Sequence, residues 1–293
     1  MLRFKTLSTL GLSSLVALSM SAQPGISGQK ELIIATPFGP KSSTPDPRAR
    51  QNGWLSNRAG VSETLIGLGY DMSMQPRLAS AFENLSPTEW KITLRDGVKF
   101  HDGSLLTAAA VKDSFAKLDI EGHSGHNPRL STLLGIKDIK IIDTQTLIFE
   151  TQEPNSAFLW SLTEPSAAVM KEGSADLPLI GTGPFIFETA EAEKSYVVRG
   201  FPDYWGGEPK LNRIVLDAIP DGAVAALALK AGDVHLVSNY PEVDFAKLQE
   251  DEAGQRFSGA TTRLFFFQSR VDDGPLANGT LRHAVSLGLD RET

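Results

Sequence analysis

The chain of 293 residues contains no cysteine. This absence excludes disulfide bonds, thiolate-bound metal sites and a cysteine nucleophile. It also leaves no residue for the diacylglyceryl anchor that some exported proteins carry on a cysteine. No second apolar run of about 18 residues or more follows the N-terminal segment, so the sequence predicts a mature chain that is free in solution.

Positive charge is scarce as well: Lys and Arg total 28 against 35 for Asp and Glu, and the net charge is −7. A general nucleic-acid-binding protein needs a basic surface that displaces counterions, so the sequence argues against nucleic acid as a partner. The hydrophobic share of 41% and the charged share of 22% are ordinary for a globular protein and argue against wholesale disorder. At roughly 150 residues per domain, the length suggests about two domains.

The patterns that mark common catalytic sites are also missing. HExxH of zinc proteases, GxxxxGK[ST] of phosphate-binding loops and GxSxG of serine hydrolases do not occur. Glycine pairs within residues 67–69 and 181–183 indicate turns rather than a dinucleotide-binding loop. The sequence therefore predicts no cofactor, no bound metal and no enzymatic activity, and an exported hydrolase is the least supported alternative.

The N-terminal segment has the order of a secretory signal peptide. Arg3 and Lys5 give a basic start, residues 7–20 (LSTLGLSSLVALSM) are apolar, and Ser21 and Ala22 give a small-residue exit. The apolar stretch is shorter than the about 20 residues that a membrane-spanning helix needs. We therefore predict a signal peptide over residues 1–22 and export, which in a bacterium means the periplasm. The alternative is an apolar N-terminus of a cytosolic protein.

Local patterns indicate an α/β chain with mixed sheets. Strands are expected where apolar residues cluster or alternate, and helices where they recur every three or four positions. Alternation in residues 90–94 followed by Asp96-Gly97 predicts a hairpin with residues 98–100 as the return strand. The other expected strands are residues 31–36, 136–142, 147–150, 185–188, 196–199, 214–218, 234–237 and 264–268, and the expected helices are residues 61–68, 107–118, 281–289 and the stretch between Asp221 and Gly232.

A few side chains could contact a small molecule. The loop 122–129 carries two histidines three residues apart, the second being His126. Two imidazoles could hold a metal ion, but the glycines and proline of this loop favour a solvated loop without further ligands. Phe38 and Trp160 are aromatic residues of the kind that wall ligand clefts, although such residues are more often part of a core. Glu164 could receive an ammonium group, although exposed glutamates are commonly only solvated.

Four segments together resemble a known family. They are residues 94–111 (LRDGVKFHDGSLLTAAAV), 181–185 (GTGPF), 203–210 (DYWGGEPK) and 281–292 (LRHAVSLGLDRE). In order and spacing they are similar to the signatures of the large extracytoplasmic solute-binding proteins of bacterial ABC importers, in the peptide/nickel class known as family 5. The resemblance runs from about residue 31 to the last residue.

The resemblance implies a periplasmic-binding-protein-like (type II) fold, in which two α/β lobes with mixed sheets are joined by a hinge and an α/β subdomain is inserted in the first lobe. Closure of the lobes traps the ligand. Family members are typically much longer than this chain, so the resemblance implies that the second lobe is largely missing and that the chain alone binds solute weakly. After the signal peptide, the expected parts are the first lobe at 31–60 and 181–265, the inserted subdomain at 61–180, and the start of the hinge and second lobe at 266–293.

By the same resemblance, the chain is a non-enzymatic, monomeric periplasmic component that delivers a peptide or a nickel-type metal chelate to an ABC permease driven by an ATPase. We expect ligand contacts at Phe38, His126, Arg129 and Glu164, from their loop positions and chemistry rather than from a matched motif. In the nickel-chelate branch an arginine near the segment matching residues 162–165 meets ligand carboxylates. This chain has Glu164 there, which favours a ligand with an amino group, and peptide and chelate both remain open. The alternative to a transport role is an inactive truncated remnant or one half of a split reading frame.

Overall fold

The computed structural model describes residues 30–49, 51–69, 71–171, 179–238 and 271–288. The chain divides into two units, Met1–Glu242 and Val243–Thr293. The described part of the second unit holds the short 3-10 helix η2 (Pro275–Ala277) and helix α7 (Gly279–Leu287). Asn278 caps α7, because its Oδ1 accepts a hydrogen bond from the Thr280 N–H at 2.8 Å.

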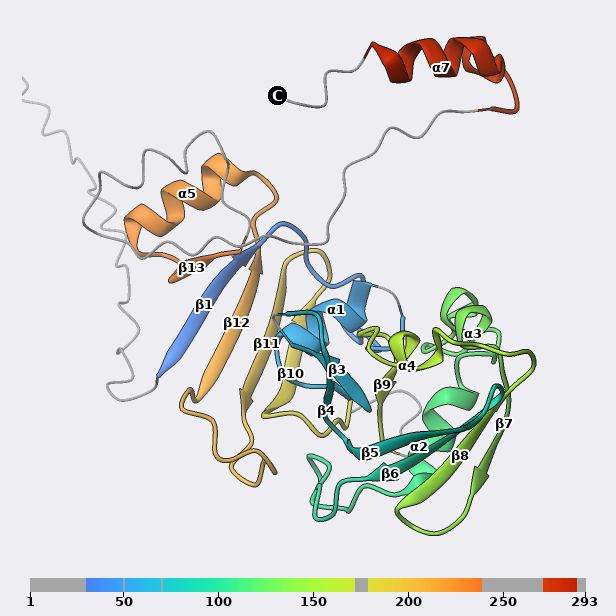
Figure 1. The fold of residues 1–293 in the computed structure, drawn as a ribbon. Helices are drawn as coiled ribbons and strands as arrows, with labels where there is room; N and C mark the ends of the chain where they lie inside the picture. The colour runs from blue at the N-terminus through green and yellow to red at the C-terminus, as the bar shows by residue number, and fades with distance from the viewer. Residues whose placement is uncertain (1–29, 50, 70, 172–178, 239–270, 289–293) are drawn as a thin grey trace, which may run out of the picture. The chain divides into compact units, whose positions relative to one another are not determined.

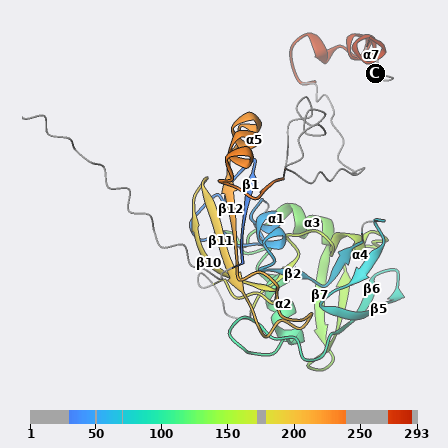
Figure 2. The same cartoon turned by 90° about the vertical axis from the view of Figure 1, so that its left-hand side faces the viewer.

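A five-stranded mixed sheet organises the first unit. Its strand order is β10 (Phe185–Glu191), β11 (Ser195–Gly200), β12 (Arg213–Ala218), β1 (Glu31–Thr36) and β13 (Leu236–Val237). Strands β10, β11 and β12 are antiparallel, whereas β12, β1 and β13 run parallel. Figures 1 and 2 show β10, β11, β12 and β1 side by side.

Strand β1 is apolar on both faces because both faces of the sheet are covered. Leu32 and Ile34 pack with one hydrophobic cluster, and Ile33 packs with another that includes Ala225 of helix α5 (Gly222–Ala231). The continuous apolar run that predicted this strand therefore reflects burial on two sides, as is usual for parallel strands.

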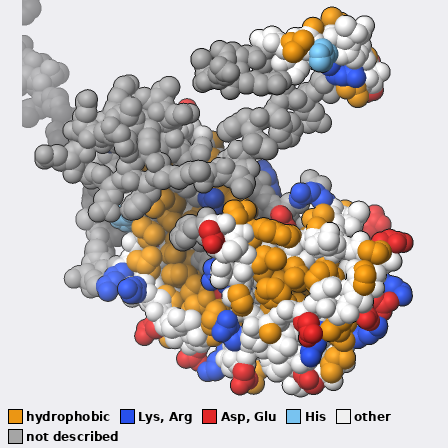
Figure 3. Space-filling view, in the orientation of Figure 1, with side chains coloured by type: hydrophobic (Ala, Val, Ile, Leu, Met, Phe, Trp, Pro, Cys, Tyr) orange, Lys and Arg blue, Asp and Glu red, His pale blue; other side chains and the backbone are white. Residues whose placement is uncertain are grey.

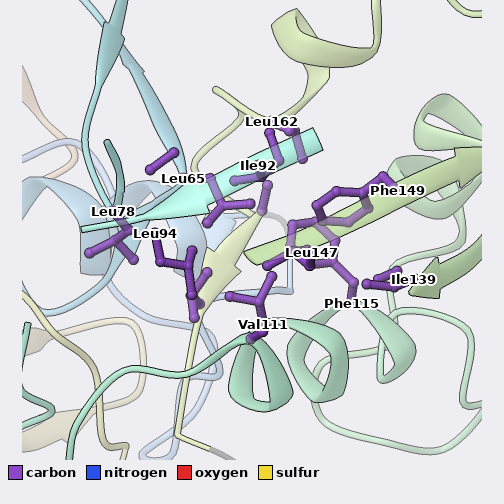
Figure 4. Packing of buried hydrophobic residues seen from close by; sticks show 14 of the residues in the cluster. Leu65, Leu78, Ile92, Leu94, Val111, Phe115, Ile139, Leu147, Phe149 and Leu162 are labelled. Atoms are coloured by element: carbon purple, nitrogen blue, oxygen red, sulfur yellow. The ribbon is translucent and has the colours of Figure 1, made fainter. Parts of the chain in front are cut away.

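The second sheet of this unit is antiparallel throughout. Its order is β5 (Ala79–Ser86), β6 (Glu89–Leu94), β8 (Thr146–Thr151) and β7 (Ile136–Ile141). Buried and less buried residues alternate along β6 and β8, as the period of two predicts. Helix α2 (Ala108–Ala116) packs on this sheet: Phe115 meets Phe149 edge to face at a centroid distance of 5.2 Å, and Figure 4 shows Val111 and Phe115 near Leu147.

Short elements complete the first unit. Strand β2 (Glu63–Thr64) pairs with β9 (Ala168–Val169), and β3 (Ile66–Leu68) pairs with β4 (Met74–Pro76). The remaining helices are α1 (Gln51–Arg58), α3 (Pro128–Leu134) and α4 (Phe158–Ser161). Helices α3 and α4 position two of the candidate ligand contacts: Arg129 lies in the first turn of α3, and Glu164 follows α4.

The expectation of a helix over residues 61–68 is wrong, since this stretch contains the short strands β2 and β3. Val61 and Leu65 have helical spacing and are fully buried, but a short apolar run with this spacing also suits a buried strand. The pairing partner β9 lies about a hundred residues further along the chain, where local periodicity carries no information about it.

The expected hairpin between residues 90–94 and 98–100 is also wrong. Asp96 and Gly97 do form a turn, with Gly97 at a φ of 73°, but β6 has β5 on one edge and β8 on the other. No edge of β6 is therefore free for a return strand, and Lys99 makes only an isolated bridge to Leu105.

Most of the other predicted elements are confirmed where the structure describes them. The strands at 31–36, 90–94, 136–142, 147–150, 185–188, 196–199 and 214–218 and the helices at 107–118, 281–289 and between Asp221 and Gly232 occur with small shifts of their ends. The strand at 234–237 is reduced to β13, and β5 has no counterpart among the expected strands. The expected strand at 264–268 and the signal peptide at 1–22 lie outside the described residues.

One face of the described residues carries both signs of charge. In Figure 3, Lys, Arg, Asp and Glu are interspersed around the periphery of this face, and hydrophobic side chains gather towards its middle. A face of this kind has no extended basic field for nucleic acid. Within the described ranges, no helix is long and apolar enough to cross a bilayer.

Candidate functional site

A hollow of about 260 Å³ brings together two of the residues that the sequence singled out. We call it the α3 hollow; it is lined by Asn127, Arg129, Leu130, Glu164 and Ser166. Arg129 belongs to the first turn of α3, and Glu164 lies just beyond α4. The two charged residues thus come from segments far apart in the sequence and reach the same depression.

The wall on the α3 side is held in place by helix capping. Asn127 is the N-cap of α3, and its Oδ1 accepts a hydrogen bond from the Leu130 N–H at 3.2 Å. Pro128 occupies the first helical position, where its missing N–H costs nothing. Leu130 is buried and gives this wall an apolar part. The cap therefore sets the direction in which the first turn, with Arg129, leaves the loop.

The charged groups of Arg129 and Glu164 are not paired with other side chains of the described residues. Arg129 is exposed and Glu164 is half-buried, and within the described part of the chain neither side chain has an ion-pair or hydrogen-bond partner. A guanidinium can bind a carboxylate through two parallel hydrogen bonds, and a carboxylate can accept from an ammonium group. The α3 hollow can therefore meet both charged ends of a small zwitterion.

Phe38 and His126, the other two predicted ligand contacts, lie elsewhere. Phe38 packs against Trp54, with ring centroids 4.7 Å apart, at the edge of a hydrophobic cluster. His126 is half-buried in the loop before α3, where its backbone N–H donates to the His123 carbonyl at 3.0 Å. Neither residue lines one of the hollows found within the described ranges, so their ligand role stays a prediction.

A second hollow, of about 440 Å³, is lined in part by a buried carboxylate that already has partners. Glu63 accepts hydrogen bonds from Thr182 Oγ1 at 3.0 Å, Tyr204 Oη at 2.9 Å and Trp205 Nε1 at 3.0 Å. Burial raises the pKa of Glu63, and these three donors oppose that rise. Because donors of the chain itself already engage both oxygens, we interpret Glu63 as a cross-link within the fold rather than as a ligand contact.

A second group, the partly buried His101, has a similar structural role. Its Nε2 lies 3.0 Å from the Gly183 carbonyl, its Nδ1 accepts from the Gly181 N–H at 3.3 Å, and its ring meets Phe201 edge to face. Burial lowers the pKa of His101 to about 4, so the ring is neutral at pH 7 with the proton on Nε2. Local sequence patterns give no sign of either contact, because Gly181 and Gly183 are remote from His101 in the sequence.

The third hollow, of about 240 Å³, lies at the carboxyl ends of the parallel strands β1 and β13, beside the start of α5. Its lining is mainly apolar and includes no charged side chain. The Asp221 carboxylate already accepts the N–H groups of Ala223 and Val224 at the start of this helix. This hollow therefore offers little to orient a charged solute.

Metal coordination has no candidate in the described ranges, where no three or more His, Asp and Glu side chains are grouped so that they could hold an ion. The α3 hollow thus remains the arrangement best suited to a small charged molecule. Two of the five histidines bond the backbone of the chain: His101 contacts Gly183, and His235 Nδ1 accepts from the Ile33 N–H.

The sequence of this chain is similar to a family of known proteins. The model of the bacterial extracellular solute-binding proteins, family 5 Middle, matches residues 73–293. The glutathione-binding protein GsiB of Salmonella typhi is 28% identical over 300 residues, which cover 98% of this chain and 56% of that protein. This chain therefore spans about half the length of the curated relatives that it matches.

Solved structures agree. The nickel ABC transporter of Bacillus halodurans has a TM-score of 0.69 and 26% identity, covering 76% of this chain and 46% of its own. The murein tripeptide binding protein MppA of Escherichia coli has a TM-score of 0.75 at 21% identity, covering 90% of this chain and 57% of its own, and shows likeness of fold alone. The expected periplasmic-binding-protein-like α/β fold is thereby confirmed.

Proposed function

Because this chain belongs to the family 5 bacterial extracellular solute-binding proteins, we propose that it acts as the solute-binding component of an ABC importer, with the α3 hollow contacting the solute. Such a component binds its solute without chemical change and presents it to an ABC permease driven by an ATPase. The proposed compartment is the periplasm, reached by means of the signal peptide at residues 1–22.

One observation carries the proposal: opposite charges on Arg129 and Glu164 line one hollow and are without partners in the described structure. A ligand that carries both a carboxylate and an ammonium group would satisfy both residues at once. Small peptides have this chemistry, and a glutathione-binding protein is among the relatives. We therefore propose a small peptide as the solute class.

A metal chelate is the second candidate, supported by the likeness to a nickel ABC transporter. Arg129 could meet a carboxylate of such a chelate, but Glu164 in the same hollow would repel a carboxylate-rich ligand. The inactive-remnant alternative has less support, since the relatives reported above are named as binding or transport proteins.

The domain organisation proposed from the sequence accords with the sheets. The chain returns to the five-stranded sheet at β10 after building the four-stranded sheet and its helices, so we propose that residues 61–180 are an insertion in a lobe formed by 31–60 and 181–265. Solute capture in this family-type fold would use a hinge, with residues 266–293 as the start of the hinge and second lobe.

Isothermal titration with chemically matched peptides tests the proposal. The probes are L-alanyl-L-alanine, its N-acetylated form and its C-terminally amidated form, with reduced glutathione and Ni(II)–histidine titrated in parallel. Losing one charge-assisted contact costs about 1.5–3 kcal/mol, so Arg129→Met and Glu164→Gln should each weaken dipeptide binding by about 10- to 100-fold.

Each substitution should weaken binding only of peptides that carry the group its residue is proposed to contact: the C-terminal carboxylate for Arg129 and the ammonium group for Glu164. Arg129→Met should bind the amidated peptide as the wild type does, and Glu164→Gln should do so for the acetylated peptide. Lys210→Met and Glu121→Gln, both at exposed positions outside the hollow, are the matched charge controls. Wild-type protein that binds none of these probes up to about 10 mM, or variants that bind all of them equally, would contradict the proposal.

A further inference from the structure

Next to the loop that precedes α3 lies an ion pair that is almost fully buried. Arg48 Nη2 and Asp46 Oδ2 are 2.6 Å apart, Arg48 Nε donates to Asp46 Oδ1 at 3.0 Å, and the exposed side-chain fractions are 2% and 3%. The Arg48 backbone N–H also donates to Asp46 Oδ1 at 2.9 Å. The two side chains therefore form a rigid two-point fork within a turn before α1.

This ion pair holds the loop that precedes α3. Ser124 Oγ donates to Asp46 Oδ2 at 2.8 Å, and Asn127 Nδ2 donates to the Arg48 carbonyl at 2.8 Å. A Cβ on Gly125 would lie only 2.6 Å from Arg48 Nε, so the loop backbone lies directly against the guanidinium. Because Asn127 is the N-cap of α3, these contacts are transmitted to the helical turn that carries Arg129.

The opposite wall of the hollow rests on the same stretch of chain. A Cβ on Gly53 would lie 2.3 Å from the Pro47 carbonyl oxygen and 3.0 Å from the Ser166 nitrogen. Ser166 lines the α3 hollow two residues after Glu164. Asp46 and Arg48 thus support the Arg129 wall, and Pro47 and Gly53 lie close to the Glu164 wall.

Stability alone is a poor reason for this arrangement. A buried ion pair loses the hydration of both charges, and apolar replacements are often neutral or stabilising. Arg48 Nη1 is buried and has no hydrogen-bond partner in the described structure, which adds to that cost. What the pair supplies is a defined geometry between segments that are far apart in sequence.

We propose that the Asp46–Arg48 ion pair positions Arg129 relative to Glu164 and thereby sets the separation of charges that the hollow accepts. This inference rests on the proposed function of the α3 hollow. Asp46 and Arg48 do not line the hollow, so they are positioning residues and not ligand contacts.

The test replaces the pair without leaving a lone buried charge. The variant is Asp46→Asn with Arg48→Met, and the stability control is Glu63→Met, which removes a buried acceptor that does not line the α3 hollow. Two readouts are compared: hydrogen exchange of the Leu130 and Ser131 amides, which bond to Asn127, and affinity for L-alanyl-L-alanine.

In the double variant, we expect the exchange protection at these two amides to fall by about tenfold or more, because local opening of this turn becomes easier. The dipeptide affinity should fall by about the same factor for the same reason. Glu63→Met should change neither the exchange protection at these amides nor the dipeptide affinity, even if it melts at the same temperature as the double variant. Arg48→Lys keeps the charge without the fork, and should recover part of both losses.

Unchanged exchange at Leu130 and Ser131, or equal changes in Glu63→Met, would overturn the positioning role. Hydrogen exchange needs no ligand, so the two proposals can fail separately. If the protein binds no dipeptide but the double variant still exchanges faster at Leu130 and Ser131, the proposed function is contradicted and the coupling between the ion pair and α3 is supported. If the double variant does not fold, Ser124→Ala removes one hydrogen bond of the same group and should produce a smaller change at the same amides; no change there would equally overturn the inference.

Discussion

Glu63 has three hydrogen-bond donors around one buried carboxylate, and it joins three segments of the fold. Thr182 lies in the GTGPF segment, while Tyr204 and Trp205 lie in the DYWGG segment. Two motifs that looked independent in the sequence therefore converge on one side chain. A buried network of this kind is costly when it is only partly satisfied.

Replacing Glu63 with methionine should lower the unfolding free energy by about 3 kcal/mol. Methionine has a similar length but leaves the three donors without an acceptor, and each buried unsatisfied group costs roughly 1–3 kcal/mol. Glu63→Gln is the matched control: its amide oxygen can accept from Thr182 and Trp205 while its NH₂ donates to the Tyr204 oxygen. Urea denaturation at pH 7 measures both, and equal stability of the Met and Gln variants would contradict the network.

The glutamine variant should also change the dependence of stability on pH. Burial raises the pKa of Glu63 above the usual 4.5, so the folded protein keeps this proton at a pH where the unfolded chain has lost it. Stability from this group is therefore present at low pH and declines as the pH rises above about 4.5. Glu63→Gln should remove that decline, as a urea series between pH 4 and 7 would show.

His101 acts in the opposite direction. Its folded-state pKa of about 4 lies below the usual 6.5, so the unfolded chain takes up a proton first as the pH falls. The stability that His101 contributes is complete above pH 6.5 and is lost as the pH falls towards 4, with a difference of roughly 3 kcal/mol. His101→Gln should flatten this part of the profile, whereas His283→Gln at an exposed position of α7 should leave it unchanged.

An NMR titration gives an independent check on His101. The ring signal should keep its neutral position at pH 5.5, where an ordinary histidine is mostly protonated. A midpoint near 6.5 would show that the ring is solvated, contrary to its contacts with Gly181 and Gly183.

Helix α5 shows how far local sequence can define an element. Its residues are strong helix formers, Asp221 provides the N-cap, and Gly232 adopts a φ of 82° at the C-terminal end. The start, the body and the end of α5 are therefore all predictable from local sequence alone. Strands β2 and β3 show the contrary case, because their partners are remote in sequence.

Asp221→Ala should loosen the first turn of α5. The Asp221 carboxylate accepts from the N–H groups of Ala223 and Val224, and loss of such a cap costs about 1 kcal/mol, or roughly a fivefold change in local opening. Hydrogen exchange at these two amides measures the effect. Asp221→Ser keeps a capping oxygen and should exchange nearly as the wild type does; faster exchange in both variants would point to a cause other than the cap.

Across the first unit, polar contacts join segments of two large hydrophobic clusters. One cluster surrounds the four-stranded sheet and the other lies on the five-stranded sheet. Glu63 and His101 provide bonds between segments that belong to these clusters, and Trp205 packs against the first. We therefore expect these contacts to make the unfolding of the two clusters cooperative.

Removing both contacts should therefore separate the unfolding of the two clusters. In scanning calorimetry, the wild type should show one transition for this unit with equal calorimetric and van't Hoff enthalpies. The double variant Glu63→Met with His101→Leu should show two transitions, whereas a double surface variant, Glu83→Gln with Glu121→Gln, should keep one. A single two-state transition in the first double variant would contradict the coupling.

The candidate site was only partly predictable. Arg129 and Glu164 were chosen for their chemistry and do share the α3 hollow. Phe38, expected on the same chemical ground, packs on Trp54 and lines none of the described hollows, so its ligand role stays a prediction. The chemical type of a side chain is visible in sequence, whereas its neighbours depend on how remote segments pack.

By itself, the sequence determined the class of fold, the family, most helices and strands of the two main sheets, and both ends of α5, because these depend on periodicity, propensity and signature segments near one another. Only the tertiary structure decided that Asp46 and Arg48 contact the loop before α3, that Glu63 joins segments 119–142 residues away, and that residues 63–64 and 66–68 are strands. The physical reason is that burial and hydrogen-bond partners are properties of remote segments brought together, and local patterns do not encode which segments meet.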